Sequence, residues 1–234
     1  MNPRGSVNEV MCRLIGNKLL VETPEMHASE GMQAFIRTEQ EREQKRWVWE
    51  IIRGAREADE VRVRTPEFVV LPDTERPNRD SVDVEPPVRS NLQLRSPLRA
   101  PGNPCPLRAP ASPWMLEKRR WDAWQRQAPL VNWLGIATDP GLRSLRDVRG
   151  RHAPMLREML EATRARISEE TGVDPDEVMA YVHYPPSVYQ LHVHFAYPYA
   201  QYNHRDVYRI HSVETVLANL ALDPEYYAKA SLQA

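Results

Sequence analysis

The sequence predicts an α+β fold in which an antiparallel sheet packs against helices. The alternation typical of strands occurs near residues 61–71 and 177–197, and a segment with helical spacing at 151–172 separates the two. A hairpin followed by a helix, further strands and a last helix favours an antiparallel sheet over repeated βαβ units. The chain has 234 residues, of which 41% are hydrophobic, and this is enough for one sizeable domain with additions.

The first predicted elements are a helix and a hairpin. Residues 25–53 have the charged, helix-forming composition of one long helix, and Gly54 is a suitable end signal. A solvated N-terminal arm is the alternative, because the charge density of this segment is high. Hydrophobicity then alternates over residues 61–63, breaks at Pro66 and resumes over residues 68–71, which predicts a β-hairpin.

Residues 77–113 differ in composition from the rest of the chain. Nine of the 21 prolines lie there, with scattered Arg and Ser and little apolar periodicity. Since proline lacks an N–H donor and blocks helices and inner strands, we expect an insertion or a disordered loop. The insertion is also a candidate docking segment for a protein partner. Residues 114–137 then restore a bulky apolar pattern, as a helix or strand entering the core, and their four tryptophans are more typical of packing than of ligand stacking.

Two further helices follow from apolar spacing. The first lies within residues 151–172, and Gly172 is expected to cap its C-terminus. The second begins near Ser212. The apolar positions that predict the two helices are Met155, Leu156, Met159, Leu160 and Ile167 in the first and Val213, Val216, Leu217 and Leu220 in the second.

Residues 177–186 and 188–197 read as two strands, and the second carries the most informative pattern in the chain. On this strand Gln190, His192 and His194 share one face, whereas the intervening Leu, Val and Phe point into the core. The two imidazoles would lie about 7 Å apart, which is two strand rises.

Such a face suits the binding of a phosphate. One histidine nitrogen can attack phosphorus while neighbouring histidines donate to the non-bridging oxygens. Three alternatives remain open from residue chemistry alone: a zinc site with His183 as third ligand, a polar solvent face, and a purely structural hydrogen bond for His183.

Charge and cysteine content narrow the class of protein. A net charge of −1 gives no overall attraction to nucleic acid or membrane, so phosphate binding must rest on local arginines. Cys12 and Cys105 are far apart and form no CxxC pair, which argues against a disulfide scaffold or a zinc ribbon. The sequence contains neither a signal peptide nor a long apolar run. We expect a soluble protein without a membrane partner, in the reducing environment of the cytoplasm, the nucleus or both.

Several blocks, in the same order, resemble the scavenger mRNA decapping enzymes of the histidine triad (HIT) superfamily. The similarity spans residues 47–73 and 120–232. The blocks are "WVWEIIRGAREADEVRV", "FVVLPD", "GLRSLRD", "HYPPSVYQLHVHF" and "NLALDPEYY". The resemblance implies a HIT-like antiparallel sheet with flanking helices.

The resemblance also implies a division of the chain. Residues 1–46 would be an N-terminal arm or helix, the remnant of an N-terminal domain that is mostly absent. Residues 47–76 would form a hinge and a β-hairpin that contribute to a cap pocket. Residues 77–113 would be the insertion, and residues 114–234 the HIT-like catalytic domain.

The implied activity is hydrolysis of a phosphoric anhydride. Scavenger decapping enzymes cleave the triphosphate bridge of short 7-methylguanosine-capped RNA or of the cap dinucleotide, release 7-methylguanosine monophosphate, and use no metal or cofactor. By position in the motif, His192 would be the nucleophile. His194 and His183 match histidines that contact phosphate, and Ser187 and Arg209 match further phosphate-binding positions.

The cap base is methylated and cationic, so it requires an aromatic face and a carboxylate. Stacking on indole would contribute about 1–2 kcal/mol of cation–π interaction when desolvated. Trp47 matches the stacking residue, Glu57 the carboxylate that accepts from guanine, and Asp73 a residue that contacts the nucleoside. The alternatives are that Trp47 only packs the end of a helix and that Glu57 is a surface charge.

The sequence departs from the family pattern at several positions. Gln190 replaces the first histidine of the triad, so proton transfer at that position is lost although glutamine still donates and accepts. Val188 replaces a tyrosine, and Glu75 replaces a lysine, for which Arg120 is a candidate substitute. The resemblance also leads us to expect that most of the family's N-terminal domain, which closes over the substrate in a swapped dimer, is missing.

The predicted function is therefore a scavenger-type decapping pyrophosphatase that is a homodimer through its HIT-like domain. One alternative is a less selective HIT nucleotide hydrolase or phosphoramidase, which a weak preference for the methylated cap would reveal. The other is a cap-binding protein or complex subunit that has lost turnover. Gln190, Val188 and the absent lid favour this last reading, whereas the intact His192 and His194 oppose it.

Overall fold

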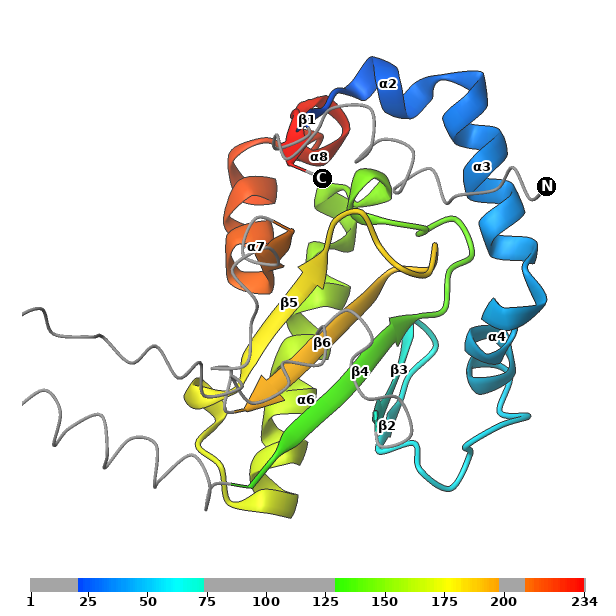
Figure 1. Cartoon of the computed structure of the whole chain (residues 1–234). Helices are drawn as coiled ribbons and strands as arrows, with labels where there is room; N and C mark the ends of the chain where they lie inside the picture. Colours follow the sequence, from blue (N-terminus) through cyan, green and yellow to red (C-terminus); the bar gives the residue numbers. More distant parts are fainter. Residues whose placement is uncertain (1–20, 74–128, 198–208, 234) are drawn as a thin grey trace, which may run out of the picture.

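The computed structural model describes residues 21–73, 129–197 and 209–233, and the predicted insertion, both cysteines, Glu75 and Arg120 lie outside them. The described part is built on a six-stranded antiparallel sheet with the strand order β2-β3-β4-β6-β5-β7 (Figure 1). The predicted α+β class and the predicted hairpin, β2-β3, are confirmed. The strands are β2 (Val63–Arg64), β3 (Phe68–Pro72), β4 (Val131–Ala137), β5 (Met179–His183), β6 (His192–Tyr197) and β7 (Ile210–Ser212).

The prediction of one long helix over residues 25–53 is wrong. Ser29 has an extended backbone and ends the first short helix, and its hydroxyl accepts from the Met32 N–H to begin the next. Arg42, also extended, ends that helix, and Gly54 with φ 74° follows the last, as predicted. The breaks let the last helix turn onto the sheet. The segments are α2 (Pro24–Ala28), α3 (Glu30–Glu41), the 3-10 turn η1 (Glu43–Lys45) and α4 (Trp47–Ile52).

One face of the sheet is covered by α6 (Ala153–Thr171), which lies behind the sheet in Figure 1. The predicted apolar positions of this helix are all buried, and Gly172 with φ 74° caps it. The helix approaches closely at Gly135, where a Cβ would lie 2.7 Å from Met159 Sδ. Leu191, Val193 and Phe195 point into this core, as expected.

The helix predicted to begin near Ser212 is confirmed as α7 (Val213–Leu222). The Ser212 hydroxyl caps its N-terminus by accepting from the Thr215 N–H.

Within the described residues no helix is long and apolar enough to cross a membrane. The remaining short elements are η2 (Leu145–Asp147), η3 (Gly150–His152), η4 (Pro175–Glu177), α8 (Tyr226–Lys229), β1 (Val21–Glu22) and β8 (Leu232–Gln233).

The opposite face of the sheet is only partly covered by α4. Val48 and Ile51 of this helix pack on four residues of β3 and β4, which are Val69, Leu71, Leu134 and Ile136. In the register of β4 with β6, Ile136 pairs with His192 and Leu134 with His194. The histidines therefore continue the α4-covered face towards β5.

A buried polar cluster joins the N-terminal and C-terminal segments, where β1 pairs with β8. The Arg146 guanidinium donates to the Tyr184 hydroxyl at 3.2 Å and to the backbone carbonyls of Glu22, Tyr227 and Ala230. The Tyr184 hydroxyl in turn donates to the Glu22 carboxylate. Burial alone would raise the pKa of Glu22, but hydrogen bonds from His27 and Tyr184 and the charges of His27 and Arg146 lower it.

Replacing Arg146 with Met should lower the free energy of unfolding by about 3–5 kcal/mol, because the buried Glu22 carboxylate would lose the guanidinium charge beside it. Urea denaturation followed by circular dichroism measures this change. Arg166→Met is the control, since Arg166 pairs on the surface with Glu169 and Glu170 and its loss should cost under about 1 kcal/mol. Equal losses for the two variants would contradict the role of the buried cluster.

Candidate active site

The structure brings the three histidines of the motif together. His183 is the last residue of β5, and His192 and His194 lie on the neighbouring β6. The ring centroids of His183 and His194 are 4.9 Å apart, and those of His192 and His194 are 5.1 Å apart. The second spacing is shorter than the strand rise predicts, so these two rings lean towards each other. All three side chains are buried, which excludes an open solvent-facing strand.

A backbone carbonyl sets the tautomer of His192. Its Nδ1 lies 2.7 Å from the carbonyl oxygen of Gln190. Because a carbonyl oxygen only accepts, Nδ1 must carry the hydrogen. The lone pair of the neutral ring is then on Nε2, so Nε2 is the nucleophilic atom.

His194 is held as a neutral imidazole. Burial, and then the neighbouring His192 and His183, lower its pKa well below the ordinary value. The ring of Tyr181 stacks on it at 5.1 Å with an interplanar angle of 13°. Neither ring nitrogen of His194 has a hydrogen-bond partner among the described residues. A ligand oxygen that reached this ring would therefore meet one N–H donor without competition from a described protein acceptor.

The side-chain amide of Gln190 is hydrogen-bonded to the backbone. Its side-chain nitrogen donates to the carbonyl of Ala137 at 2.6 Å and to that of Asp139 at 2.9 Å. Both amide hydrogens are thus used to hold the start of β6 against the end of β4. Gln190 was predicted among the catalytic residues, and the structure places it as a support for this turn.

The predicted phosphate residues lie around the β5–β6 loop, residues 184–191. Ser187 is exposed on this loop. The Arg209 guanidinium donates to the carbonyl of Pro185 at 2.9 Å, and the Arg209 carbonyl accepts from the Tyr184 N–H. Val188 packs against the apolar cluster under α4. The loop begins after His183 and ends before His192, so Ser187 and Arg209 stand at the end of the sheet where the histidines meet.

The predicted cap residues lie on the α4 side. Trp47 is the first residue of α4 and is half-buried against the cluster that includes Ile136, the register partner of His192. Asp73 follows β3 and is tied through its backbone to Asn132. Glu57 has a left-handed backbone, and its carboxylate accepts from Arg56 Nε at 2.9 Å. Trp47 thus packs at the helix start and also borders the histidine face.

Sequence reasoning missed the residues of the N-terminal helices that bind the β5–β6 loop. Gln40 donates to the carbonyl of Tyr189 at 3.1 Å, and Lys45 donates to the carbonyl of Ser187 at 2.7 Å. No sequence signal could have found them, since more than a hundred positions separate the partners. Among the described residues no three His, Cys, Asp or Glu side chains are arranged to hold a metal ion.

The described residues thus place two histidines on an inner strand of an antiparallel sheet that is backed by one long helix. Residues 124–207 match the family model described as scavenger mRNA decapping enzyme C-term binding. Over the residues that match, the chain is similar to scavenger mRNA decapping enzymes.

Curated relatives show the same similarity. The chain is 34% identical over 113 residues to the m7GpppX diphosphatase of Sus scrofa, covering 48% of this chain and 33% of the relative. It is 32% identical over 118 residues to that of Caenorhabditis elegans, covering 50% and 37%. It is 24% identical over 181 residues to that of Schizosaccharomyces pombe, covering 76% and 43%. The chain thus spans between 33% and 43% of the length of these relatives.

The lowered pKa of His194 predicts a pH dependence of stability. In the unfolded chain His194 binds a proton near pH 6.5, whereas in the folded chain it does not. The contribution of His194 to the free energy of unfolding is therefore fully present above this pH and is lost as the pH is lowered. The slope reaches about 1.4 kcal/mol per pH unit for each such group. His194→Gln should reduce the slope between pH 7 and pH 5 in urea denaturation, while His211, with a pKa lowered by burial, keeps its share.

Imidazole NMR provides a second readout that does not depend on the stability of a variant. The His194 ring signals of the wild-type chain should not titrate between pH 8 and pH 6. A midpoint near pH 6.5 would contradict the burial argument.

Proposed function

We propose that the chain hydrolyses the triphosphate bridge of the 7-methylguanosine cap dinucleotide or of short capped RNA. The observation that carries this proposal is the His192 ring, oriented by the Gln190 carbonyl so that Nε2 holds the lone pair, within a cluster of three histidines. The relatives are named m7GpppX diphosphatases, and this name supports the same chemistry.

The proposed reaction has two displacements at phosphorus. His192 Nε2 attacks the phosphorus next to the methylated nucleoside, and the P–O bond to the rest of the bridge breaks. The diphosphate end of the second nucleotide leaves with the electron pair of that bond. Water then attacks the phosphohistidine, and the release of 7-methylguanosine monophosphate restores the ring.

The neighbouring groups stabilise the negative charge on the phosphate oxygens. His194 is neutral and can give one N–H to a non-bridging oxygen, and His183 lies beside it. Arg209 provides a permanent cation at the base of the β5–β6 loop, and its planar fork suits two oxygens at once. Ser187, exposed on the loop, adds a hydroxyl.

For the cap base we propose stacking on Trp47, with Glu57 accepting from the guanine edge and Asp73 contacting the nucleoside. The half-buried position of Trp47 beside the apolar cluster supports this role, because part of the indole stays accessible. Glu57 forms an ion pair with Arg56 in the segment that follows α4.

The test of the reaction is chromatographic analysis of products from a 7-methylguanosine-capped dinucleotide, with a chelator present. Wild type should release 7-methylguanosine monophosphate. His192→Asn should release it at least about a hundredfold more slowly, because the nucleophile is removed. Product formed equally fast by the variant would reject His192 as nucleophile.

Trp47→Ala should raise KM for the methylated dinucleotide about tenfold, which corresponds to the loss of a cation–π interaction of about 1–2 kcal/mol. KM for the unmethylated dinucleotide should change less. Trp49→Ala is the matched control, since Trp49 lies on the same short helix and is also half-buried. A wild-type chain without preference for the methyl group would indicate the less selective nucleotide hydrolase.

A cap-binding protein without turnover is the second candidate, and the Gln190 amide favours it. With both amide hydrogens on backbone carbonyls, Gln190 cannot shuttle a proton. This function would be supported if the chain bound the cap without releasing product and if His192→Asn bound the cap equally well. Assembly into a homodimer and a protein partner at residues 77–113 stay predictions.

A further inference from the structure

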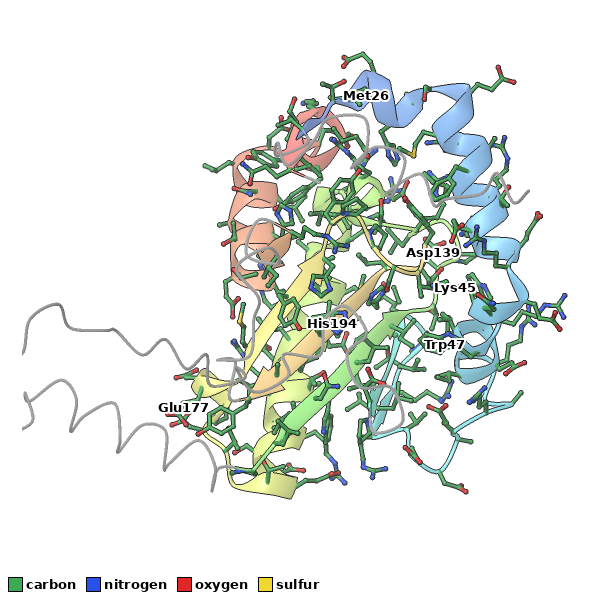
Figure 2. All side chains as sticks on the ribbon, in the orientation of Figure 1. Met26, Lys45, Trp47, Asp139, Glu177 and His194 are labelled. Carbon is green, nitrogen blue, oxygen red and sulfur yellow. The ribbon has the colours of Figure 1, made fainter. Side chains whose placement is uncertain are left out.

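Lys45 is the last residue of η1 and lies two positions before Trp47. Figure 2 shows both residues on the N-terminal helical segment, on the side of the sheet that carries β3 and β4. Lys45 is half-buried, whereas the four residues before it and Arg46 after it are exposed. The turn therefore directs this one cation towards the body of the protein.

The Lys45 ammonium contacts the β5–β6 loop directly. Its Nζ donates to the carbonyl of Ser187 at 2.7 Å. On the other side of the loop, Arg209 donates to the carbonyl of Pro185. Two cations thus hold the loop, one from a segment near the N-terminus and one from the start of β7.

The Lys45 ammonium retains capacity for a ligand. Of its three N–H groups one is used on Ser187, and the contact itself is exposed. Within residues 21–73, 129–197 and 209–233 no carboxylate lies within ion-pair distance of it. The Lys45 charge lies at the end of the sheet that carries His183 and His192. No described carboxylate neutralises it there.

We propose that Lys45 binds non-bridging oxygens of the substrate's phosphate bridge, from the side of the β5–β6 loop opposite Arg209. This inference rests on the proposed function and adds a phosphate-binding residue to it. A bridge of three phosphates carries several negative charges, so it needs cations on more than one side. In the proposed complex the cap base stacks on Trp47 and a phosphorus atom reaches His192. Because Lys45 lies two residues before Trp47, its charge would then lie beside the bound ligand.

The experiment is isothermal titration calorimetry of the full chain with two probes. One is a cap dinucleotide whose bridging oxygens are replaced by methylene groups, so that it cannot be hydrolysed, and the other is the 7-methylguanosine nucleoside. Lys45→Met removes both the charge and the donor. Lys45→Gln keeps an N–H donor for the Ser187 carbonyl but removes the charge. Arg46→Met is the matched control, with the same loss of charge one residue away on an exposed side chain.

Both Lys45 variants should weaken binding of the dinucleotide analogue about tenfold or more, the usual effect of losing a hydrogen bond between charged groups. Binding of the nucleoside should change less than about twofold, and Arg46→Met should behave like wild type. This pattern would assign the Lys45 charge to the phosphates.

Three outcomes would overturn the proposal. If Lys45→Gln binds the analogue like wild type, Lys45 only tethers the loop. If both probes are weakened equally, the effect is structural. If Arg46→Met weakens binding as much, the effect is one of overall charge. Because the analogue cannot react, a wild-type chain that binds it without turning over the natural dinucleotide would refute the proposed hydrolysis and still test Lys45.

Discussion

The antiparallel pairing of β6 between β4 and β5 determines the geometry on which the site depends. Strand side chains alternate with a period of two, so the register decides which face each residue of β6 occupies. In the observed register Val193 and Phe195 enter the core under α6, and His192 and His194 face the α4 side. A slip of one residue would place both imidazoles beneath α6 and Phe195 on the opposite face of the sheet. The large apolar burial of Phe195 thus holds the histidines in place.

Burial then sets the chemistry of the rings. With little solvent to support a charge, His194 stays neutral, and the Gln190 carbonyl fixes the tautomer of His192. The β5–β6 loop is held by contacts from elements distant in sequence, through Gln40, Lys45 and Arg209. A loop held in this way presents its groups in one arrangement before a ligand arrives, and this reduces the reorganisation that binding requires.

The buried cluster around Arg146 links this loop to the ends of the described chain. Tyr184, the first residue of the loop, receives a hydrogen bond from Arg146 and gives one to Glu22. The block "GLRSLRD", which is part of the resemblance to the family, thus contributes a structural arginine, Arg146. Stability of the β1–β8 pairing and the position of the loop depend on the same charged groups.

The sequence by itself determined the class of fold, the hairpin, α6 with its glycine cap, the start of α7 and the common face of the histidines. Each of these depends on periodicity or capping over a few residues, which a sequence displays directly. Only the tertiary structure decided the rest: the use of the Gln190 amide by the backbone and the contact of Lys45 with Ser187. The physical reason is that these features arise where segments far apart in the chain pack together, and local patterns carry no information about such contacts.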